Sequence, residues 1–282
     1  MRLNPNKTLK FLDKSGFAGR EQMLTLVGQF HDTRQISLTE FGVRTANMLS
    51  ASKTHCLTNF VELTDIGKEQ KIDFVCKGTV KASYEAKAEY DRVAMLNFAD
   101  ALVPGGLVES GATTQEENIC RCTNLYESLL ANPDYYNANR LAECCKSGVY
   151  TDYTIYSVGA TIFKDDLTYE RVEPVDVDII TCPSPIGYSL GLDAMEDVLK
   201  LRIRKFLKLA QLHGVKAIVL GAWGCGAFGQ PIDLMAKCFA EVLREANAFE
   251  KVIFAIRGNE SSSGVSKTLT DFKKYFDETY YR

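Results

Sequence analysis

The chain is 282 residues long, with 46% hydrophobic and 24% charged residues, a composition typical of globular proteins that excludes a largely disordered chain. Its net charge of -3 lacks the basic excess of proteins that hold nucleic acid through phosphates, so we expect no direct nucleic-acid binding. The chain shows no signal sequence and no run of about 18 apolar residues, which predicts no membrane association, and its nine cysteines favour a reducing, cytoplasmic location.

The N-terminal part of the chain reads mostly as helix and loop. Apolar stripes predict helices around residues 23–27 and 39–48, and residues 60–63 show only a weak strand pattern. We therefore predict that residues 1–85 form an N-terminal helical extension, packed on a core of residues 86–282 within a single compact domain.

Sharper patterns begin at residue 93. Residues 93–98 are a short apolar run between charged residues and a Pro-Gly-Gly turn, which indicates a buried strand. Residues 111–130 place apolar side chains at helical spacing behind Thr113 or Thr114, either of which can cap a helix. Further strands are predicted at 153–158, 175–181, 217–220 and 251–256, and further helices at 193–213, 232–246 and 268–275. Strands that alternate with helices predict an α/β fold with a mostly parallel sheet covered on both faces.

A glycine-rich loop follows the apolar strand 217–220. Residues 221–229 contain four glycines, which let the backbone wind tightly and turn several N–H groups toward one anion. The next helix adds the positive end of its dipole, so a phosphate or diphosphate is the expected guest. The spacing matches neither G-x-G-x-x-G nor a kinase-type P-loop, and a plain strand-to-helix turn is the alternative.

A second glycine turn precedes an acidic helix start. Gly105 and Gly106 are followed by Gln115, Glu116 and Glu117. Two adjacent carboxyl groups beside a flexible loop suit a general acid and an acceptor for sugar hydroxyls, because like charges help each other retain a proton. The alternative is that acidic residues in the first turn only stabilise the helix.

Taken together, the two motifs resemble a known family. Gly105-Gly106-Leu107, seven residues and then Gln115-Glu116-Glu117 are similar to the GGG-x(6–8)-QEE signature of poly(ADP-ribose) glycohydrolases, which are macrodomain proteins. The wider string from Asn97 to Tyr126, and residues 219–229 and 252–256, resemble the microbial branch of this family. The resemblance extends over roughly residues 91–258.

The resemblance implies a macrodomain-like three-layer α/β/α sandwich that binds ADP-ribose. It implies hydrolysis of the O-glycosidic ribose–ribose bond of poly(ADP-ribose), with release of ADP-ribose and without a metal or cofactor. Glu117 would be the general acid and base, Glu116 would bind hydroxyls of the terminal ribose, and Gln115 would support the loop. The lack of coiled-coil heptads further favours a monomer.

The resemblance also implies a set of substrate-binding residues. The first glycine turn would pass beneath the terminal ribose, residues 221–229 would hold the diphosphate, and an aromatic ring would pack on the nucleoside or ribose. The residues assigned to this set are Gly105, Gly106, Asp100, Gly221, Gly224, Cys225, Gly226, Ala227 and Phe228.

Two positions depart from the family pattern. Leu107 stands where the third glycine of the triplet is expected, and Asp100 stands where many macrodomains carry an asparagine that binds the terminal ribose. These departures leave two alternatives open: a non-catalytic ADP-ribose-binding macrodomain, or a hydrolase of another conjugate, such as mono-ADP-ribosylated protein or nucleic acid.

Other reactive side chains point to no second activity. Trp223 is expected in the core, with ligand contact as the alternative, and Cys225 has no nearby histidine that would activate it as a nucleophile. The cysteines at 120, 122, 144 and 145 lack the spacing of a zinc site. The basic residues of the helix at 193–213 predict a solvated face, and they are Lys200, Arg202, Arg204, Lys205 and Lys208.

Overall fold

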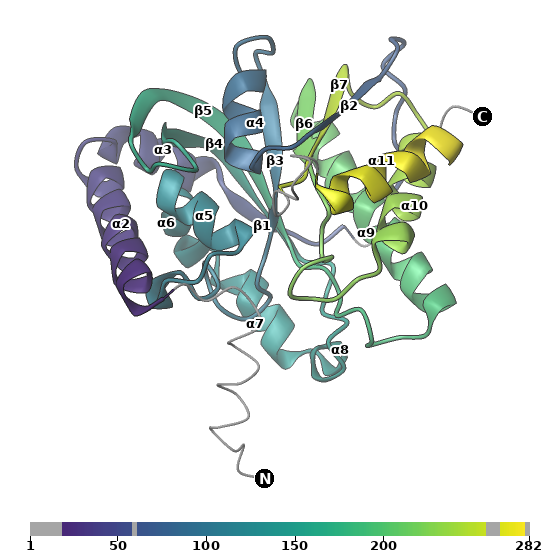
Figure 1. The fold of residues 1–282 in the computed structure, drawn as a ribbon, viewed down its shortest axis with the longest axis horizontal. Coiled ribbons are helices and arrows are strands. Elements are labelled where there is room, and N and C mark those ends of the chain that lie inside the picture. The colour runs from purple at the N-terminus through teal and green to yellow at the C-terminus, as the bar shows by residue number, and fades with distance from the viewer. Residues whose placement is uncertain (1–18, 58–60, 258–265, 280–282) are drawn as a thin grey trace.

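The fold is built around one mixed sheet. The computed structural model describes residues 19–57, 61–257 and 266–279, and within them seven strands pair in the order β1-β4-β5-β3-β6-β7-β2 (Figure 1). The strands are β1 (Lys53–His55), β2 (Lys71–Val75), β3 (Val93–Phe98), β4 (Thr154–Lys164), β5 (Arg171–Cys182), β6 (Ala217–Leu220) and β7 (Lys251–Ala255). The pairs from β5 through β3, β6 and β7 to β2 are parallel, and β4 is antiparallel to both its neighbours. The prediction of a mostly parallel sheet is therefore confirmed.

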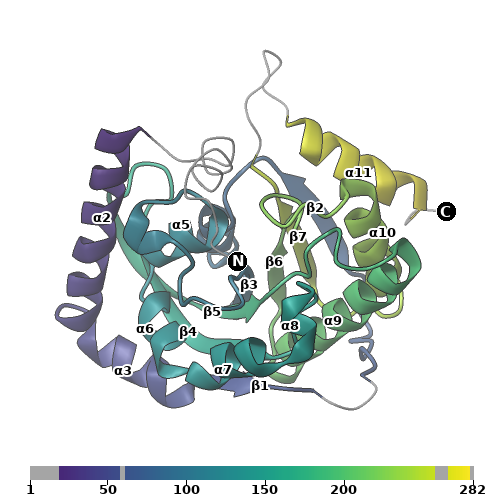
Figure 2. The ribbon, with the colours of Figure 1, turned by 90° about the horizontal axis from the view of Figure 1, so that it is seen from below.

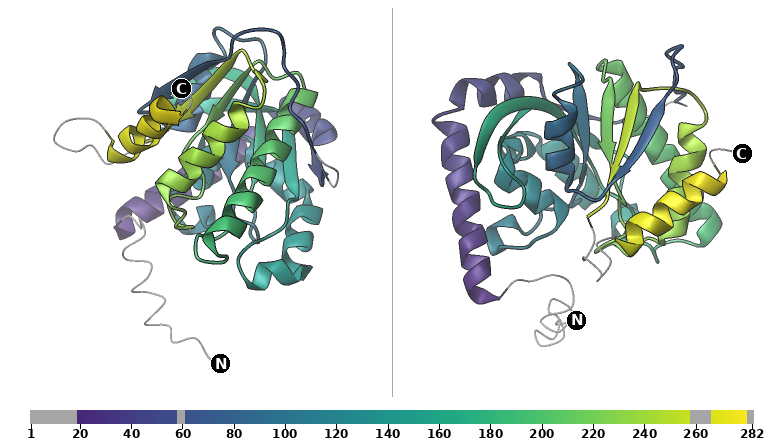
Figure 3. Two further views of the ribbon diagram at one scale, coloured as in Figure 1. Left: turned by 90° about the vertical axis from the view of Figure 1, so that its right-hand side faces the viewer. Right: turned by 45° about the horizontal axis from the view of Figure 1, so that its top comes forward.

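Helices cover the sheet on both faces, as Figures 2 and 3 show. One layer consists of α9 (Leu192–Leu212), α10 (Ile232–Leu243) and α11 (Lys267–Thr279). The other side holds α2 (Arg20–Leu38), α3 (Gly42–Ala51), α4 (Thr79–Ala86), α5 (Gln115–Cys122), α6 (Leu125–Ala131) and α7 (Pro133–Leu141). The short elements η1 (Val108–Ser110) and α8 (Glu143–Lys146) complete the described chain. None of the helices described is both long and apolar enough to cross a membrane.

The central strands form two apolar layers because successive side chains of a strand point to opposite faces. In β3, Ala94 and Leu96 join the cluster under α9 and α10, while Val93 and Met95 join the cluster under the N-terminal helices. All four side chains are buried, which explains why this strand reads as a continuous apolar run.

The N-terminal segment contributes more than a helical covering. Its helix α3 packs on β4 and its helix α2 packs on α3, α5 and η1, but β1 and β2 also come from this segment and form the two edges of the sheet. No strand forms over residues 61–63, and residues 58–60 lie outside the described residues. The predicted helical extension is therefore also part of the central sheet.

The helix predicted at 111–130 is two helices. The first begins at Gln115, with Thr114 as its N-cap residue, while Gly111, whose φ is 76°, ends the preceding helix η1. The break lies at Thr123, which is extended and forms a bridge with Ile162 of β4. Asn124 holds the break, since its side-chain oxygen accepts the N–H of Thr161 at 2.8 Å. The other predicted strands and helices of the core occur, but β4 extends to Lys164 and β5 begins at Arg171, so both strands are longer than predicted.

The basic face of α9 is only partly solvated. Arg202 is 1% exposed, and its guanidinium bonds the Asp152 carboxylate and the carbonyls of Val149, Tyr150 and Pro183. Lys205 pairs with the same carboxylate at 2.6 Å. The prediction of a solvated face was wrong for these two residues, which instead tie α9 to the segments before β4 and after β5.

Candidate active site

A cavity of about 590 Å³ lies at the carboxyl ends of β3, β6 and β7. Its wall includes ten of the predicted site residues: Asp100, Gly106, Gln115, Glu116, Glu117, Gly224, Cys225, Gly226, Ala227 and Phe228. The two remaining predicted residues lie behind the wall: Gly105 against Tyr126, and Gly221 against Phe98 and the carbonyl of Ala255. The acidic helix start and the glycine-rich loop therefore share one cavity, at the strand ends where ligands of open α/β sheets bind.

Gln115 fixes the start of α5 to the end of β3. Its side-chain oxygen accepts the N–H of Phe98 at 2.8 Å, and its amide donates to the Leu96 carbonyl at 2.7 Å. The same amide donates to the Thr79 hydroxyl at 2.9 Å. Since all three partners belong to other elements, Gln115 positions the two carboxylates that follow it.

Glu116 is a buried carboxyl group with two strong donors. One oxygen accepts from the side-chain amide of Asn97 at 3.0 Å, and the other accepts the N–H of Asp100 at 2.7 Å. Burial raises the pKa of Glu116 well above its ordinary value, and the negative charges of Glu117 and Asp100 add to the shift. The sequence analysis named Asn97 only as the first residue of the family motif and predicted no role for it.

Glu117 lies under the loop that carries the first glycine turn. Its Oε1 accepts the backbone N–H of Leu107 at 3.0 Å, and its Oε2 pairs with the Thr114 hydroxyl. The side chain is largely enclosed, because the residue is only 4% exposed, yet it lines the cavity. A carboxyl group held in this way presents a defined geometry to a sugar bound in the cavity.

The first glycine turn requires glycine at both positions. Gly105 and Gly106 have φ of 69° and 58°, in the left-handed region that favours glycine. A Cβ on Gly105 would lie 2.8 Å from the Tyr126 ring. The turn therefore lets the backbone pass directly over the α5 carboxylates.

Leu107 and Asp100, the two departures from the family pattern, both fit the local backbone. Leu107 has φ of -103°, which any residue adopts, and its side chain is 45% exposed. The Asp100 carboxylate accepts the N–H groups of Leu102 and Val103 at 2.7 and 2.8 Å, so it shapes the loop that leads to Gly105. Direct binding of the substrate by Asp100 stays a prediction.

The glycine-rich loop packs against other protein segments on the side that faces away from the cavity. A Cβ on Gly224, whose φ is 74°, would lie 2.2 Å from the Ser184 hydroxyl, whereas a Cβ on Gly226 would meet no atom within 4 Å. The carbonyl of Phe228 accepts the N–H of Gly187 at 2.7 Å. The loop is thus supported on its protein side and open where Gly226 lines the cavity.

Two further residues of the loop, Trp223 and Cys225, were considered as ligand contact and nucleophile. Trp223 is fully buried, and its indole N–H donates to the Cys182 carbonyl at 3.1 Å, so its side chain packs in the core, and the residue also forms part of the cavity wall. Burial raises the pKa of the Cys225 thiol to about 12, which keeps the thiol protonated and a poor nucleophile at neutral pH.

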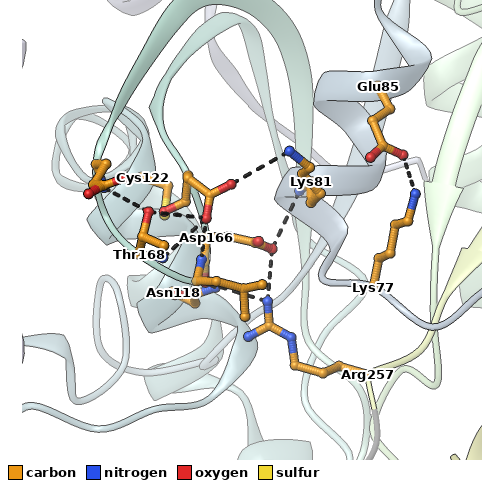
Figure 4. A network of polar contacts seen from close by, with 11 residues as sticks. Lys77, Lys81, Glu85, Asn118, Cys122, Asp166, Thr168 and Arg257 are labelled. Atoms are coloured by element: carbon orange, nitrogen blue, oxygen red, sulfur yellow. Dashed lines mark hydrogen bonds and ion pairs between the residues drawn. The ribbon is translucent and has the colours of Figure 1, made fainter. Parts of the chain in front are cut away.

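Two cations on the cavity wall were missed by the sequence analysis. Lys77 precedes α4 and Arg257 follows β7, and both line the cavity. Figure 4 shows Arg257 held by Asp166, whose carboxylate lies 3.1 Å from the guanidinium and is almost fully buried. Only the fold brings these residues beside the motifs, because they come from segments far apart in the sequence.

Comparisons with known proteins identify what the chain resembles. A family model described as microbial-type PARG, catalytic domain, where PARG is poly(ADP-ribose) glycohydrolase, matches residues 25–165. This match reaches into the N-terminal segment, beyond the range that the motifs indicated. No match was found among curated proteins.

Solved structures of poly(ADP-ribose) glycohydrolases share the fold over most of the chain. PARG from Thermomonospora curvata is 28% identical, covers 89% of this chain and 99% of its own, and has a TM-score of 0.80. A second structure from that organism, bound to the inhibitor ADP-HPD, has a TM-score of 0.77 with the same identity and coverage. PARG from Deinococcus radiodurans in complex with ADP-ribose is 30% identical, covers 84% of this chain and 98% of its own, and has a TM-score of 0.72. These matches confirm the predicted macrodomain-like fold.

Proposed function

This chain belongs to the microbial-type poly(ADP-ribose) glycohydrolase family and is a glycohydrolase of that class; from this premise we propose that Glu117 is the general acid and base of its reaction. The observation that carries the assignment is the cavity shared by the acidic start of α5 and residues 221–229. A nucleotide sugar that spans both segments places its ribose at the carboxylates and its diphosphate at the glycine loop.

The proposed reaction uses one carboxyl group in two steps. Glu117 donates its proton to the glycosidic oxygen while the bond from that oxygen to the anomeric carbon breaks, and the bonding electron pair stays on the oxygen. Water then attacks the oxocarbenium-like ribose, and its proton passes to the Glu117 carboxylate, which restores the acid. The thiol, metal and redox chemistries play no part in this scheme.

Glu116 and the residues around it hold the terminal ribose in the proposal. Each Glu116 oxygen already accepts one hydrogen bond. A carboxylate oxygen can accept a second hydrogen bond. Ribose hydroxyls are therefore the natural further donors. The backbone of Gly106 passes close to the ribose, and Phe228, which lines the cavity within the glycine loop, packs on the nucleoside or ribose.

The proposal extends to the setting in which the enzyme works. All seven cysteines whose side chains are described are free thiols, which supports a reducing, cytoplasmic location. We propose a monomer without cofactor that acts on ADP-ribose polymers and does not bind nucleic acid directly. The net charge of -3 supports the last point.

Defined substrates test the assignment. Purified protein is incubated with poly(ADP-ribose) and, separately, with a mono-ADP-ribosylated peptide, and released ADP-ribose is measured. Release from the polymer is the expected result. ADP-ribose binding by calorimetry without release from either substrate selects a non-catalytic module, and release from the peptide alone selects a hydrolase of another conjugate.

A further inference from the structure

Leu107 directly follows the first glycine turn, and its backbone is hydrogen-bonded to the proposed acid. Its N–H donates to Oε1 of Glu117 at 3.0 Å, and its side chain lines the cavity while remaining 45% exposed. It follows a turn in which the N–H of Gly106 bonds the Val103 carbonyl at 3.1 Å. The backbone of Leu107 is thus fixed next to Glu117, a residue that is 4% exposed, while the apolar side chain of Leu107 stays partly exposed at the cavity wall.

The position of the acid fixes where the leaving group must be. An acid that protonates the glycosidic oxygen lies within hydrogen-bond reach of it, about 2.6–3.2 Å. The leaving oxygen and the N–H of Leu107 therefore approach the same carboxylate. Atoms attached to the leaving oxygen extend away from the enclosed ribose and toward the mouth, where the Leu107 side chain is exposed.

We propose that the Leu107 side chain contacts the leaving group and packs against the adenine base of the polymer that remains after ADP-ribose is released. This inference rests on the proposed function, because in poly(ADP-ribose) the ribose–ribose bond joins the released unit to the 2′-oxygen of an adenosine in the remaining polymer. Adenine offers a flat, largely apolar face that a half-exposed leucine covers at little desolvation cost. A glycine at this position has no side chain to offer, so Leu107 is a specificity-determining residue of this chain.

Two substrates that differ only in the leaving group isolate this contact. One is a dimer of ADP-ribose, which releases an adenosine-containing unit, and the other is the methyl glycoside of ADP-ribose, which releases methanol. Leu107→Ala is expected to lower kcat/KM on the dimer about tenfold, from the apolar area lost, and to change kcat/KM on the methyl glycoside less than about twofold. The affinity for free ADP-ribose, measured by calorimetry, stays unchanged.

Two more variants separate packing from other effects. Leu107→Asn keeps the size of the side chain and removes its apolar character, so it behaves as Leu107→Ala does. Leu102→Ala is the matched control, because Leu102 is 37% exposed in the same loop and does not line the cavity. It leaves kcat/KM on both substrates unchanged.

The outcomes distinguish the inference from the proposed function. Equal losses on both substrates would show that Leu107 acts through Glu117, and a loss of ADP-ribose affinity would show that it contacts the retained sugar. Either result, or no change on the dimer, overturns the contact with adenine while leaving the hydrolase assignment intact. If the wild-type protein hydrolyses neither substrate, the proposed function itself fails.

Discussion

Gly106 lies so close to Glu117 that a Cβ atom added at position 106 would collide with the Glu117 carboxyl group. A Cβ on Gly106 would lie 2.6 Å from Oε1 of Glu117 and 3.3 Å from Oε2 of Glu116. The backbone of the glycine turn is thus the surface against which both carboxylates are held. Because φ at Gly106 is 58°, a side chain there would also be strained whatever space was available.

Gly106→Ala is therefore expected to displace Glu117 and to lower kcat/KM on poly(ADP-ribose) by at least about 100-fold. Gly214→Ala is the control, because Gly214 also has a positive φ of 73° but a Cβ there would meet nothing within 4 Å. Backbone strain lowers the free energy of unfolding of both variants by about 1–2 kcal/mol. Urea unfolding and ADP-ribose release, measured on both proteins, check this. Equal activity of the two variants would contradict the role of Gly106.

Glu117→Gln removes the transferable proton and keeps the shape of the side chain. We expect turnover of poly(ADP-ribose) to fall about 10²–10⁴-fold, while calorimetry shows ADP-ribose binding within about threefold of wild type. Glu89→Gln, at an exposed carboxylate just after α4, serves as the control and keeps full activity. Turnover by Glu117→Gln at the wild-type rate would rule out Glu117 as the acid.

The sequence predicted the parts of the molecule that local patterns specify. The buried strands β3 and β6 read as apolar runs because both their faces are covered, and both motifs of the site lie at strand ends. The edge strands β1 and β2 were not predicted, because they are three and five residues long and have no fully buried side chain. Their strand structure depends on pairing with β4 and β7, which is a long-range effect.

The same reason explains two cavity residues that were missed and one buried residue that was predicted to be exposed. Arg257 and Lys77 reach the cavity only through the fold, and nothing in their own segments indicates a ligand. Arg202 lies on a helix whose spacing predicts exposure, but carbonyls from two distant segments and Asp152 provide it with buried partners. Tertiary contacts determine the environment of these residues, and local periodicity in the sequence does not reveal such contacts.

Gly226→Ala tests where the diphosphate lies. A Cβ at Gly226 would meet no protein atom within 4 Å, so the folded protein tolerates the change and its Tm stays within about 2 °C of wild type. If the diphosphate passes over this backbone, the methyl group occupies its place, and we expect ADP-ribose affinity to fall at least about tenfold by calorimetry. Gly42→Ala on α3, also open to solvent around its Cβ position, changes neither quantity. Unchanged affinity of Gly226→Ala would place the diphosphate elsewhere.

Cys225→Ser tests the exclusion of thiol chemistry. Since burial raises the pKa of this thiol to about 12, almost none of it is thiolate at pH 7. The variant is expected to keep kcat/KM on poly(ADP-ribose) within about threefold. In the wild type, iodoacetamide should alkylate the exposed Cys56 and Cys76 before Cys225, as peptide mass analysis over time would show. Rapid alkylation of Cys225 with loss of turnover would contradict this.

The buried Glu116 carboxyl makes stability depend on pH in a definite direction. Because burial raises its pKa above the ordinary value of 4.5, the folded protein binds this proton more tightly than the unfolded chain. Its contribution to stability is therefore present below about pH 4.5 and is lost as the pH rises toward the folded pKa. Glu116→Gln removes this titration, because an amide does not ionise in this pH range.

Relative to wild type, the Glu116→Gln variant is thus expected to gain stability as the pH rises from 4.5 to 8. Urea unfolding at several pH values measures the difference in free energy of unfolding between the two proteins. Glu89→Gln, at its exposed site, provides the control and shows no such trend. Parallel pH profiles for wild type and Glu116→Gln would mean that Glu116 is ionised in the folded protein as readily as in the unfolded chain, and that its two donors outweigh the cost of burial.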